Sequence, residues 1–244
     1  MKLYHGTSTA ALDDIITRGI LPRNKRPGSR SLWPHAPSAR EAVYLTDAYA
    51  PYFAVNACGK KHSPVIVEVD TERFDRIYFA PDEDVLEQAG RGRDNVKGDM
   101  ARRTEWYRRN LFQYADGGSN DKPWRTSLKA MGTCAYLSGI PAFAITRVLV
   151  FDRGNVGRLG MHWDASITLI NYRLLGAIYR KQTGRLFGDH FDDEEISTPG
   201  FDQWKIDVPP HRRITMEKGE VLRDEHVEGS PDERVFPTFD EALA

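Results

Sequence analysis

The sequence predicts an α+β protein: a mixed or antiparallel sheet with flanking helices, followed by a C-terminal appendage of helical and extended pieces. Two apolar runs, PVIVEVD at 64–70 and AFAITRVLVFD at 142–152, have the length and β-branched content of buried strands. The pattern then changes, because DASITLINYRLLGAIYRKQTG at 164–184 has the spacing of an amphipathic helix. We therefore expect a mixed core over residues 1–155 and an extension over residues 156–244 that packs on it.

The first elements follow one another closely at the start of the chain. Residues 2–4 are predicted to form a short strand, and residues 9–17 a helix with its apolar side chains on one face. Thr7 or Ser8 has the hydroxyl side chain of an N-cap residue. Gly19 stands where a helix of this length would end.

The other elements are predicted from shorter patterns. The segment 212–227, RRITMEKGEVLRDEHV, fits either a pair of strands or one strand with a loop. The rest of the core is predicted as a Pro-, Ser- and Arg-rich loop at 22–41, a strand at 42–47, a helix at 47–58, an extended piece with a helical turn at 74–88, and a further strand within 131–141.

Composition and charge exclude some classes of protein. The 244 residues include 34 Lys and Arg against 35 Asp and Glu, so overall charge gives no case for a nucleic-acid or membrane partner. We find neither a signal peptide nor an apolar run of roughly 20 residues, the length needed to cross a bilayer. Cys58 and Cys134 lie in apolar surroundings and form no metal-ligand pattern, so we expect reduced thiols and a cytoplasmic protein.

The stretch LYHGTS, with His5, Gly6 and Thr7, combines groups that suit a ligand. An imidazole donates or accepts hydrogen bonds, so a neutral His5 can hold a ribose hydroxyl. Gly6 has no Cβ to block a close approach to its backbone, whose N–H and C=O can hold an amide. The alternative is an ordinary turn in which His5 bonds only the backbone.

A group of aromatic side chains follows in VYLTDAYAPYFA. Tyr44 ends a short strand, and Tyr49, Tyr52 and Phe53 lie on the next helix. Aromatic faces stack on flat heterocycles and attract cationic rings. The alternative is that these rings pack in the core, as aromatic residues on amphipathic helices usually do.

These motifs, in the order LYHGTS, a helix ending in RGI, a variable loop, VYLTD and PVIVEVD, resemble the ADP-ribosyltransferase superfamily. The resemblance is to its histidine–tyrosine branch, which includes the poly-ADP-ribose polymerases, the rifamycin-modifying transferases, compact bacterial transferase toxins that target DNA and, more distantly, the tRNA 2'-phosphotransferases. It covers residues 1–75 well and extends loosely to 155. It implies a split-sheet transferase core that binds NAD.

The resemblance also implies roles for single residues. His5 would bind a ribose hydroxyl of NAD, Gly6 the nicotinamide carboxamide, and Thr7 would support the turn. Tyr44 would flank the nicotinamide, with Tyr52 or Phe53 as the opposing ring. The reaction would break the nicotinamide–ribose bond through an oxocarbenium-like state, with NAD as co-substrate and no metal.

One position departs from the family pattern. The family has a glutamate at the start of the strand before the last core strand, and here that strand, within 131–141, contains no carboxylate. Thr133 is near the expected place, and Glu105 in RRTEWYRR is a substitute from elsewhere in the chain. An altered third residue in this family accompanies transfer of a single ADP-ribose unit, reliance on groups of the substrate, or loss of catalysis; we favour the first.

The acceptor is predicted from basic and aromatic side chains. In the superfamily the loop before the third-residue strand meets the acceptor, and here it ends with Trp124 and Arg125. Basic residues mixed with aromatics suit phosphate neutralisation and base stacking, so RNA or DNA is one expected acceptor. A solvated helix face, or a loop that serves the NAD diphosphate, is the alternative. The basic residues are Arg23, Lys25, Arg26 and Arg30 in the first loop, and Arg102, Arg103, Arg108 and Arg109 around Trp106 and Tyr107.

The leading hypothesis is thus an NAD-dependent mono-ADP-ribosyltransferase acting on a macromolecule, as a toxin or anti-phage effector with an inhibitory antitoxin partner. The first alternative is a non-catalytic module that binds NAD or ADP-ribose. The second is an RNA 2'-phosphotransferase, although the basic lobe which that family places before its HGT motif is missing. The acidic stretch 189–195 lacks the glycine and spacing of a calcium loop, so we predict no metal there.

Overall fold

The structure is a computed structural model that describes residues 1–26, 39–47, 49–82, 102, 124–125, 127–128, 132–156, 159 and 210–227. It is a mixed α+β fold built on one antiparallel sheet of eight strands. The strands are β1 (Lys2–Ser8), β2 (Val43–Thr46), β3 (Pro64–Asp70), β4 (Phe79–Pro81), β5 (Thr133–Tyr136), β6 (Ile145–Val150), β7 (Arg212–Glu217) and β8 (Glu220–His226). The helices are α1 (Leu12–Arg18) and α2 (Ala50–Cys58), with short 3₁₀ turns η1 (Thr9–Ala11), η2 (Arg23–Lys25), η3 (Arg76–Tyr78), η4 (Ala142–Ala144) and η5 (Arg153–Asn155).

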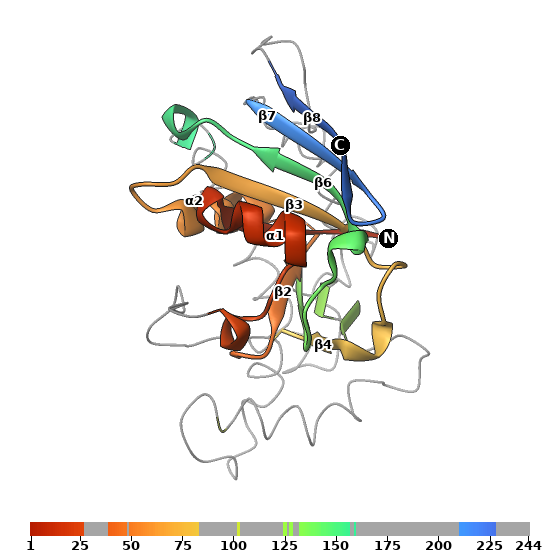
Figure 1. The fold of residues 1–244 in the computed structure, drawn as a ribbon. Coiled ribbons are helices and arrows are strands. Elements are labelled where there is room, and N and C mark those ends of the chain that lie inside the picture. The colour runs from red at the N-terminus through yellow and green to blue at the C-terminus, as the bar shows by residue number, and fades with distance from the viewer. Residues whose placement is uncertain are drawn as a thin grey trace, which may run out of the picture.

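The sheet consists of two parts joined between β1 and β2. Its strand order is β4-β5-β2-β1-β3-β6-β7-β8. β1 pairs with β3 over its whole length, whereas among the described residues its ladder with β2 contains the single pair Tyr4↔Thr46. Figure 1 shows β2 and β4 below the larger part that contains β3, β6, β7 and β8. The two motifs singled out in the sequence therefore lie on the two strands that meet at this joint.

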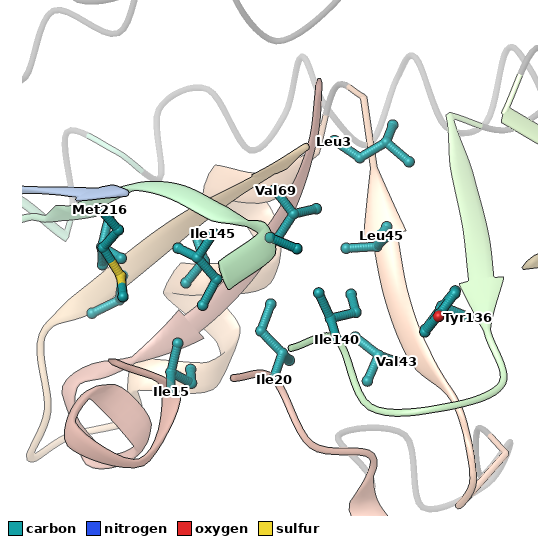
Figure 2. Packing of buried hydrophobic residues seen from close by; sticks show 14 of the residues in the cluster. Leu3, Ile15, Ile20, Val43, Leu45, Val69, Tyr136, Ile140, Ile145 and Met216 are labelled. Carbon is teal, nitrogen blue, oxygen red and sulfur yellow. The ribbon is translucent and has the colours of Figure 1, made fainter. Parts of the chain in front are cut away.

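Helices α1 and α2 cover opposite faces of the sheet. Side chains alternate between the faces along a strand, and Leu3 of β1 packs in one hydrophobic cluster with Ile15 of α1. Gly6 points to the other face, where the backbone of α2 lies against it. Figure 2 shows the α1-side cluster, to which Leu45 of β2 and Met216 of β7 also contribute.

The first helix begins later than the sequence predicts. Residues 9–11 form the 3₁₀ turn η1, and α1 starts at Leu12. Ser8 is the N-cap residue of η1, but its side chain makes no capping bond. The Thr9 hydroxyl instead accepts the Ser63 N–H at 3.0 Å, so this region is fixed by the start of β3. The predicted end at Gly19 is confirmed, with φ 84° and its N–H donating to the Ile15 carbonyl.

The segment 212–227 is a pair of strands, which settles the open choice. β7 and β8 form an antiparallel hairpin whose turn residues Lys218 and Gly219 have φ of 52° and 89°. Two positive φ angles are what a two-residue type I′ turn requires. Because β7 also pairs with β6, the described part of the predicted extension continues the core sheet. The predicted helix at 164–184 and the acidic stretch at 189–195 lie outside the described residues.

No helix within the described part of the chain is both long and apolar enough to cross a membrane.

Candidate functional site

His5 and Tyr44, predicted from separate motifs, are in direct contact. His5 Nδ1 lies 2.9 Å from the Tyr44 backbone oxygen, across the joint between β1 and β2. Burial lowers the pKa of His5 to about 4; the Tyr44 hydrogen bond opposes this shift, and the charge of Arg26 adds to it. His5 is therefore neutral at pH 7. A carbonyl oxygen only accepts, so Nδ1 carries the proton and donates to it, which leaves Nε2 as an acceptor.

Gly6 turns its peptide groups toward the β2 side of β1. The ladder between β1 and β3 is bracketed by backbone bonds from Thr71 to Met1 and from Thr9 to Ser63, both 3.0 Å. In an antiparallel pair the bonded residues alternate, so odd-numbered residues of β1 bond β3 and Gly6 faces the other way. Regular pairing with β2 is recorded only at Tyr4 among the described residues. The Gly6 N–H and C=O thus lie along the joint, beside His5.

The structure gives a different reason for glycine at position 6 from the one the sequence suggested. A Cβ at Gly6 would lie 2.5 Å from the Ala54 nitrogen and closer still to the Ala50 carbonyl oxygen. Helix α2 fills that space, so glycine is needed there for helix packing and not for approach of a ligand to that face. Thr7, the next residue, is buried and opposite Val65 in the ladder with β3.

The Tyr44 side chain is fixed in place through both its hydroxyl group and its ring. Its hydroxyl accepts the Ala39 N–H at 2.8 Å, and its ring packs against the buried residues Ala42, Ala80 and Ala135. Tyr44 is opposite Ala135 and Thr46 is opposite Thr133, so Tyr44 and Thr133 lie on one face of the sheet. The backbone of Tyr44 orients His5, while its ring covers small side chains of β4 and β5.

Of the predicted aromatic residues on α2, Phe53 is the one beside the glycine. Its Cβ is 2.6 Å from the position that a Gly6 Cβ would take. Tyr52 contacts Phe53 edge to face, with ring centroids 5.3 Å apart, but Tyr52 is buried and its pKa is raised by that burial. Tyr49 is fully buried. Phe53 is partly exposed, so of these three rings it has the most surface that a ligand could contact.

Thr133, which the sequence analysis considered for the third position, is the first residue of β5. Its carbonyl oxygen accepts the Ser127 hydroxyl at 2.7 Å, and the side chain is buried. Two carboxylates that the sequence analysis did not select lie near this position. The Asp47 N–H donates to the Gly132 carbonyl oxygen, and the Asp82 N–H donates to the Ser127 hydroxyl oxygen. Burial raises the pKa of the Cys134 thiol, and the charges of Asp82 and Asp47 raise this pKa further. Glu105 lies outside the described residues.

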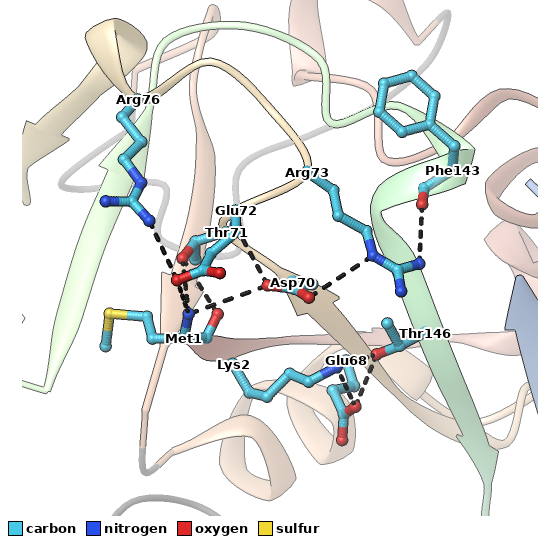
Figure 3. A network of polar contacts seen from close by, with 10 residues as sticks. All are labelled: Met1, Lys2, Glu68, Asp70, Thr71, Glu72, Arg73, Arg76, Phe143 and Thr146. Atoms are coloured by element: carbon cyan, nitrogen blue, oxygen red, sulfur yellow. Dashed lines mark hydrogen bonds and ion pairs between the residues drawn. The ribbon is translucent and has the colours of Figure 1, made fainter. Parts of the chain in front are cut away.

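A third carboxylate, Glu68, is buried in the sheet but serves the fold. Its two oxygens accept hydrogen bonds from the Thr146 hydroxyl and the Arg147 guanidinium, both at 2.6 Å, and Lys2 Nζ is 3.3 Å away. Figure 3 shows Glu68 with Lys2 and Thr146 beside the polar contacts of Asp70. Only the position of Glu68 within VEVD, an acidic residue in a buried strand, signals this role.

The predicted acceptor residues divide into a buried and an exposed group. Trp124 is a core residue, stacked on Phe79 with ring centroids 4.4 Å apart, so its ring is not open to an acceptor. Arg125 is exposed, with its guanidinium carbon 5.4 Å from the centre of the Trp124 ring. Arg102 is exposed as well. The other residues of that basic cluster, including Arg103, lie outside the described residues, as does Arg30.

Comparison with known proteins gives little support for any assignment. No family model matches the chain, and no curated protein is similar to it in sequence. A solved structure named EcPltA aligns with 64% of this chain and 79% of its own, at 11% sequence identity and a TM-score of 0.36. A likeness at that score carries no argument about function.

Proposed function

We propose that this protein is an NAD-dependent mono-ADP-ribosyltransferase that transfers ADP-ribose to a macromolecular acceptor. The observation that carries the proposal is the contact between His5 and Tyr44, 39 residues apart in the chain. This contact brings the two motifs of the family resemblance to one joint in the sheet. The order of the strands and the joint between β1 and β2 agree with the split-sheet core that the resemblance implies.

The chemistry of the joint fits NAD as a substrate. His5 Nε2, held as an acceptor, would take a hydrogen bond from a ribose hydroxyl. The Gly6 N–H and C=O would pair with the oxygen and nitrogen of a primary carboxamide, the group that distinguishes nicotinamide. Phe53 beside Gly6, and Tyr44 across the joint, would offer aromatic contacts to the cationic pyridinium ring.

The reaction that we assign breaks the bond between the pyridinium nitrogen and C1' of the ribose. Nicotinamide leaves with the bonding electron pair, the acceptor nucleophile forms the new bond to C1', and its proton passes to solvent or a base. Catalysis requires positive charge on the ribose to be stabilised and water to be excluded. Asp47 after β2 and Asp82 after β4 would be the carboxylates available near Thr133, because their N–H groups donate to Gly132 and Ser127.

The first experiment measures nicotinamide release and label transfer from NAD labelled in its adenylate part. Separate pools of RNA, DNA and protein serve as acceptors, because the exposed Arg125 and Arg102 favour a nucleic acid without excluding a protein. We expect His5→Ala to reduce nicotinamide release at least about a hundredfold, since it removes both the hydroxyl acceptor and the bond to Tyr44. His62→Ala removes an exposed histidine and is the matched control.

No release of nicotinamide and no label in any pool would contradict the transferase proposal. Equal release by the wild type and by His5→Ala would contradict the site, even if activity is present.

A second candidate function is a module that binds NAD or ADP-ribose without turning it over. The observation that favours it is Thr133, an uncharged residue at the start of β5, the strand on which the resemblance leads us to expect a glutamate. Calorimetric binding of NAD that His5→Ala abolishes, with no nicotinamide released over hours, would establish this function in place of the first.

A further inference from the structure

The hydroxyl of Thr46, at the end of β2, joins three elements beside the joint with β1. It donates to the Gly132 carbonyl oxygen at 2.6 Å and accepts the Tyr49 N–H at 2.8 Å. Tyr49 directly precedes α2, and Gly132 directly precedes β5. Thr46 is itself opposite Tyr4 of β1 and opposite Thr133 of β5. Its side chain is 1% exposed, so both hydrogen bonds are shielded from water.

Further hydrogen bonds fix the chain at the point where it enters β5. The Asp47 N–H is a second donor to the Gly132 carbonyl oxygen, at 3.2 Å, and the Gly132 N–H donates to the Leu128 carbonyl oxygen at 2.6 Å. Gly132 has φ of 69°, a conformation that favours glycine. The Ser127 hydroxyl, which is completely buried, donates to the Thr133 carbonyl oxygen at 2.7 Å. Two buried hydroxyl groups, one from β2 and one from the chain before β5, therefore hold residues 132 and 133.

The chain that these bonds fix also carries the exposed cation Arg125. Its neighbour Trp124 is buried against Phe79, and the Arg125 guanidinium carbon is 5.4 Å from the centre of the Trp124 ring. The family resemblance assigns contact with the acceptor to this part of the chain. Arg125 is thus placed by core packing on one side and by the hydrogen bonds of Gly132 on the other.

Transfer requires the acceptor to reach C1' of the ribose before water does. When the bond to nicotinamide breaks, nicotinamide leaves with the electron pair, and an acceptor group or water forms the new bond to C1' and releases its proton. The outcome depends on how well the acceptor is positioned. We propose that Thr46 is a positioning residue that orients the chain before β5, and with it the acceptor, toward the ribose held at His5. This inference rests on the proposed function, because only a transferase divides ADP-ribose between an acceptor and water.

The test measures the ratio of labelled acceptor to nicotinamide released, with whichever of the RNA, DNA and protein pools the wild type labels. Thr46→Val keeps the branched shape of the side chain and removes its hydroxyl. We expect the ratio to fall about tenfold in Thr46→Val, the effect of losing one buried hydrogen bond. Thr46→Ser retains the hydroxyl and should keep the ratio within about twofold of the wild-type value.

Thr71→Val is the matched control. Thr71 is also 1% exposed, and its hydroxyl donates to the Met1 carbonyl oxygen at 3.0 Å, just after the end of β3. Both valine variants lose a buried hydroxyl that bonds a distant backbone oxygen, so their urea midpoints should fall by similar amounts. The ratio counts products per NAD consumed, so a smaller fraction of folded protein does not change it. Thr71→Val should therefore keep the wild-type ratio.

Hydrogen exchange provides a readout that does not depend on activity. The Asp47 and Gly132 amides should exchange faster in Thr46→Val than in the wild type, and at the wild-type rate in Thr71→Val. If Thr46→Val does not fold, Ser127→Ala replaces it, because it removes the second hydroxyl that holds this part of the chain and should also lower the ratio.

The outcomes separate this inference from the proposed function. A wild-type ratio in Thr46→Val, or in Ser127→Ala where that variant replaces it, would overturn the inference and leave the transferase proposal standing. An equal fall of the ratio in Thr71→Val would do the same, since the effect would then belong to general destabilisation. A wild type that labels no pool would overturn the transferase proposal and this inference with it, whether or not it releases nicotinamide.

Discussion

His5 is held by the fold through one ring nitrogen, which leaves the other available to a ligand. The Tyr44 carbonyl fixes the proton on Nδ1, and burial keeps the ring neutral. Together these two effects make Nε2 a hydrogen-bond acceptor. The hydrogen-bonding role of His5 is therefore decided by the joint between β1 and β2 before a ligand binds.

The pKa of His5 makes stability depend on pH over a defined range. The folded-state pKa is about 4, below the ordinary value of 6.5, so the unfolded chain takes up this proton first as the pH falls. The contribution to the free energy of unfolding is complete above pH 6.5 and is lost progressively toward pH 4, by at most about 3 kcal/mol. We expect the stability of the wild type to fall more steeply across this range than that of His5→Gln, measured by urea unfolding. Equal slopes would mean that His5 titrates as it does in the unfolded chain.

At the scale of elements, the contact between α2 and β1 determines where the aromatic residues stand. Helix α2 lies directly on the backbone of Gly6, which places Phe53 there and buries Tyr49 and Tyr52. The start of α2 is fixed by Thr46, whose hydroxyl accepts the Tyr49 N–H at 2.8 Å and donates to the Gly132 carbonyl at 2.6 Å. One end of β2 therefore ties α2 to the loop before β5.

Gly6→Ala should separate α2 from β1. The added Cβ would meet backbone atoms of Ala50 and Ala54, which have no side-chain freedom to move aside. We expect a loss of about 3 kcal/mol in the free energy of unfolding, measured from urea midpoints, the upper part of the usual cost of overpacking. Gly139→Ala is the control, since its Cβ would come no closer than 3.4 Å to any neighbouring atom. Similar midpoints for the two variants would show that α2 does not pack on Gly6 as described.

Local sequence patterns predicted the positions of strands and helix ends better than the contacts of individual residues. The strand at 64–70 and the stop at Gly19 depend on nearby residues, so the sequence alone was sufficient. The start of α1 and the burial of Trp124 depend on partners far along the chain, Ser63 and Phe79, which no local pattern reveals. The dependence of Gly6 on α2 likewise appears only when helix and strand are packed together.

The contacts of the candidate site were predictable in part for the same reason. His5 and Tyr44 stand out as chemically versatile residues at strand ends, and their contact follows once β1 and β2 meet. Asp47 and Asp82 did not stand out, because an acidic residue at the end of a strand is common in loops. Their proximity to Thr133 comes from the pairing of β2 with β5 and from the Ser127 hydroxyl.

At the scale of the whole molecule, the first strand and the C-terminal hairpin belong to one sheet. β7 pairs with β6, and its Ile214 and Met216 are buried in the cluster that includes Leu3 and Ile15. Residues more than 200 positions apart thus share one hydrophobic core. A unit that ended at residue 155 would leave the edge of β6 uncovered and these contacts unmade.

Ile214→Ala tests whether the molecule unfolds as one unit. Ile214 is completely buried, so removing most of its side chain should cost about 2–5 kcal/mol and leave a single unfolding transition at a lower urea midpoint. Leu222→Ala on β8 is the control, because Leu222 is 66% exposed and its loss should change the stability by less than about 0.5 kcal/mol. Fluorescence and circular dichroism should give coincident curves for both variants. If Ile214→Ala instead produced a separate early transition with the main midpoint unchanged, the hairpin would be an independent appendage. The core that carries His5 would then fold without the hairpin.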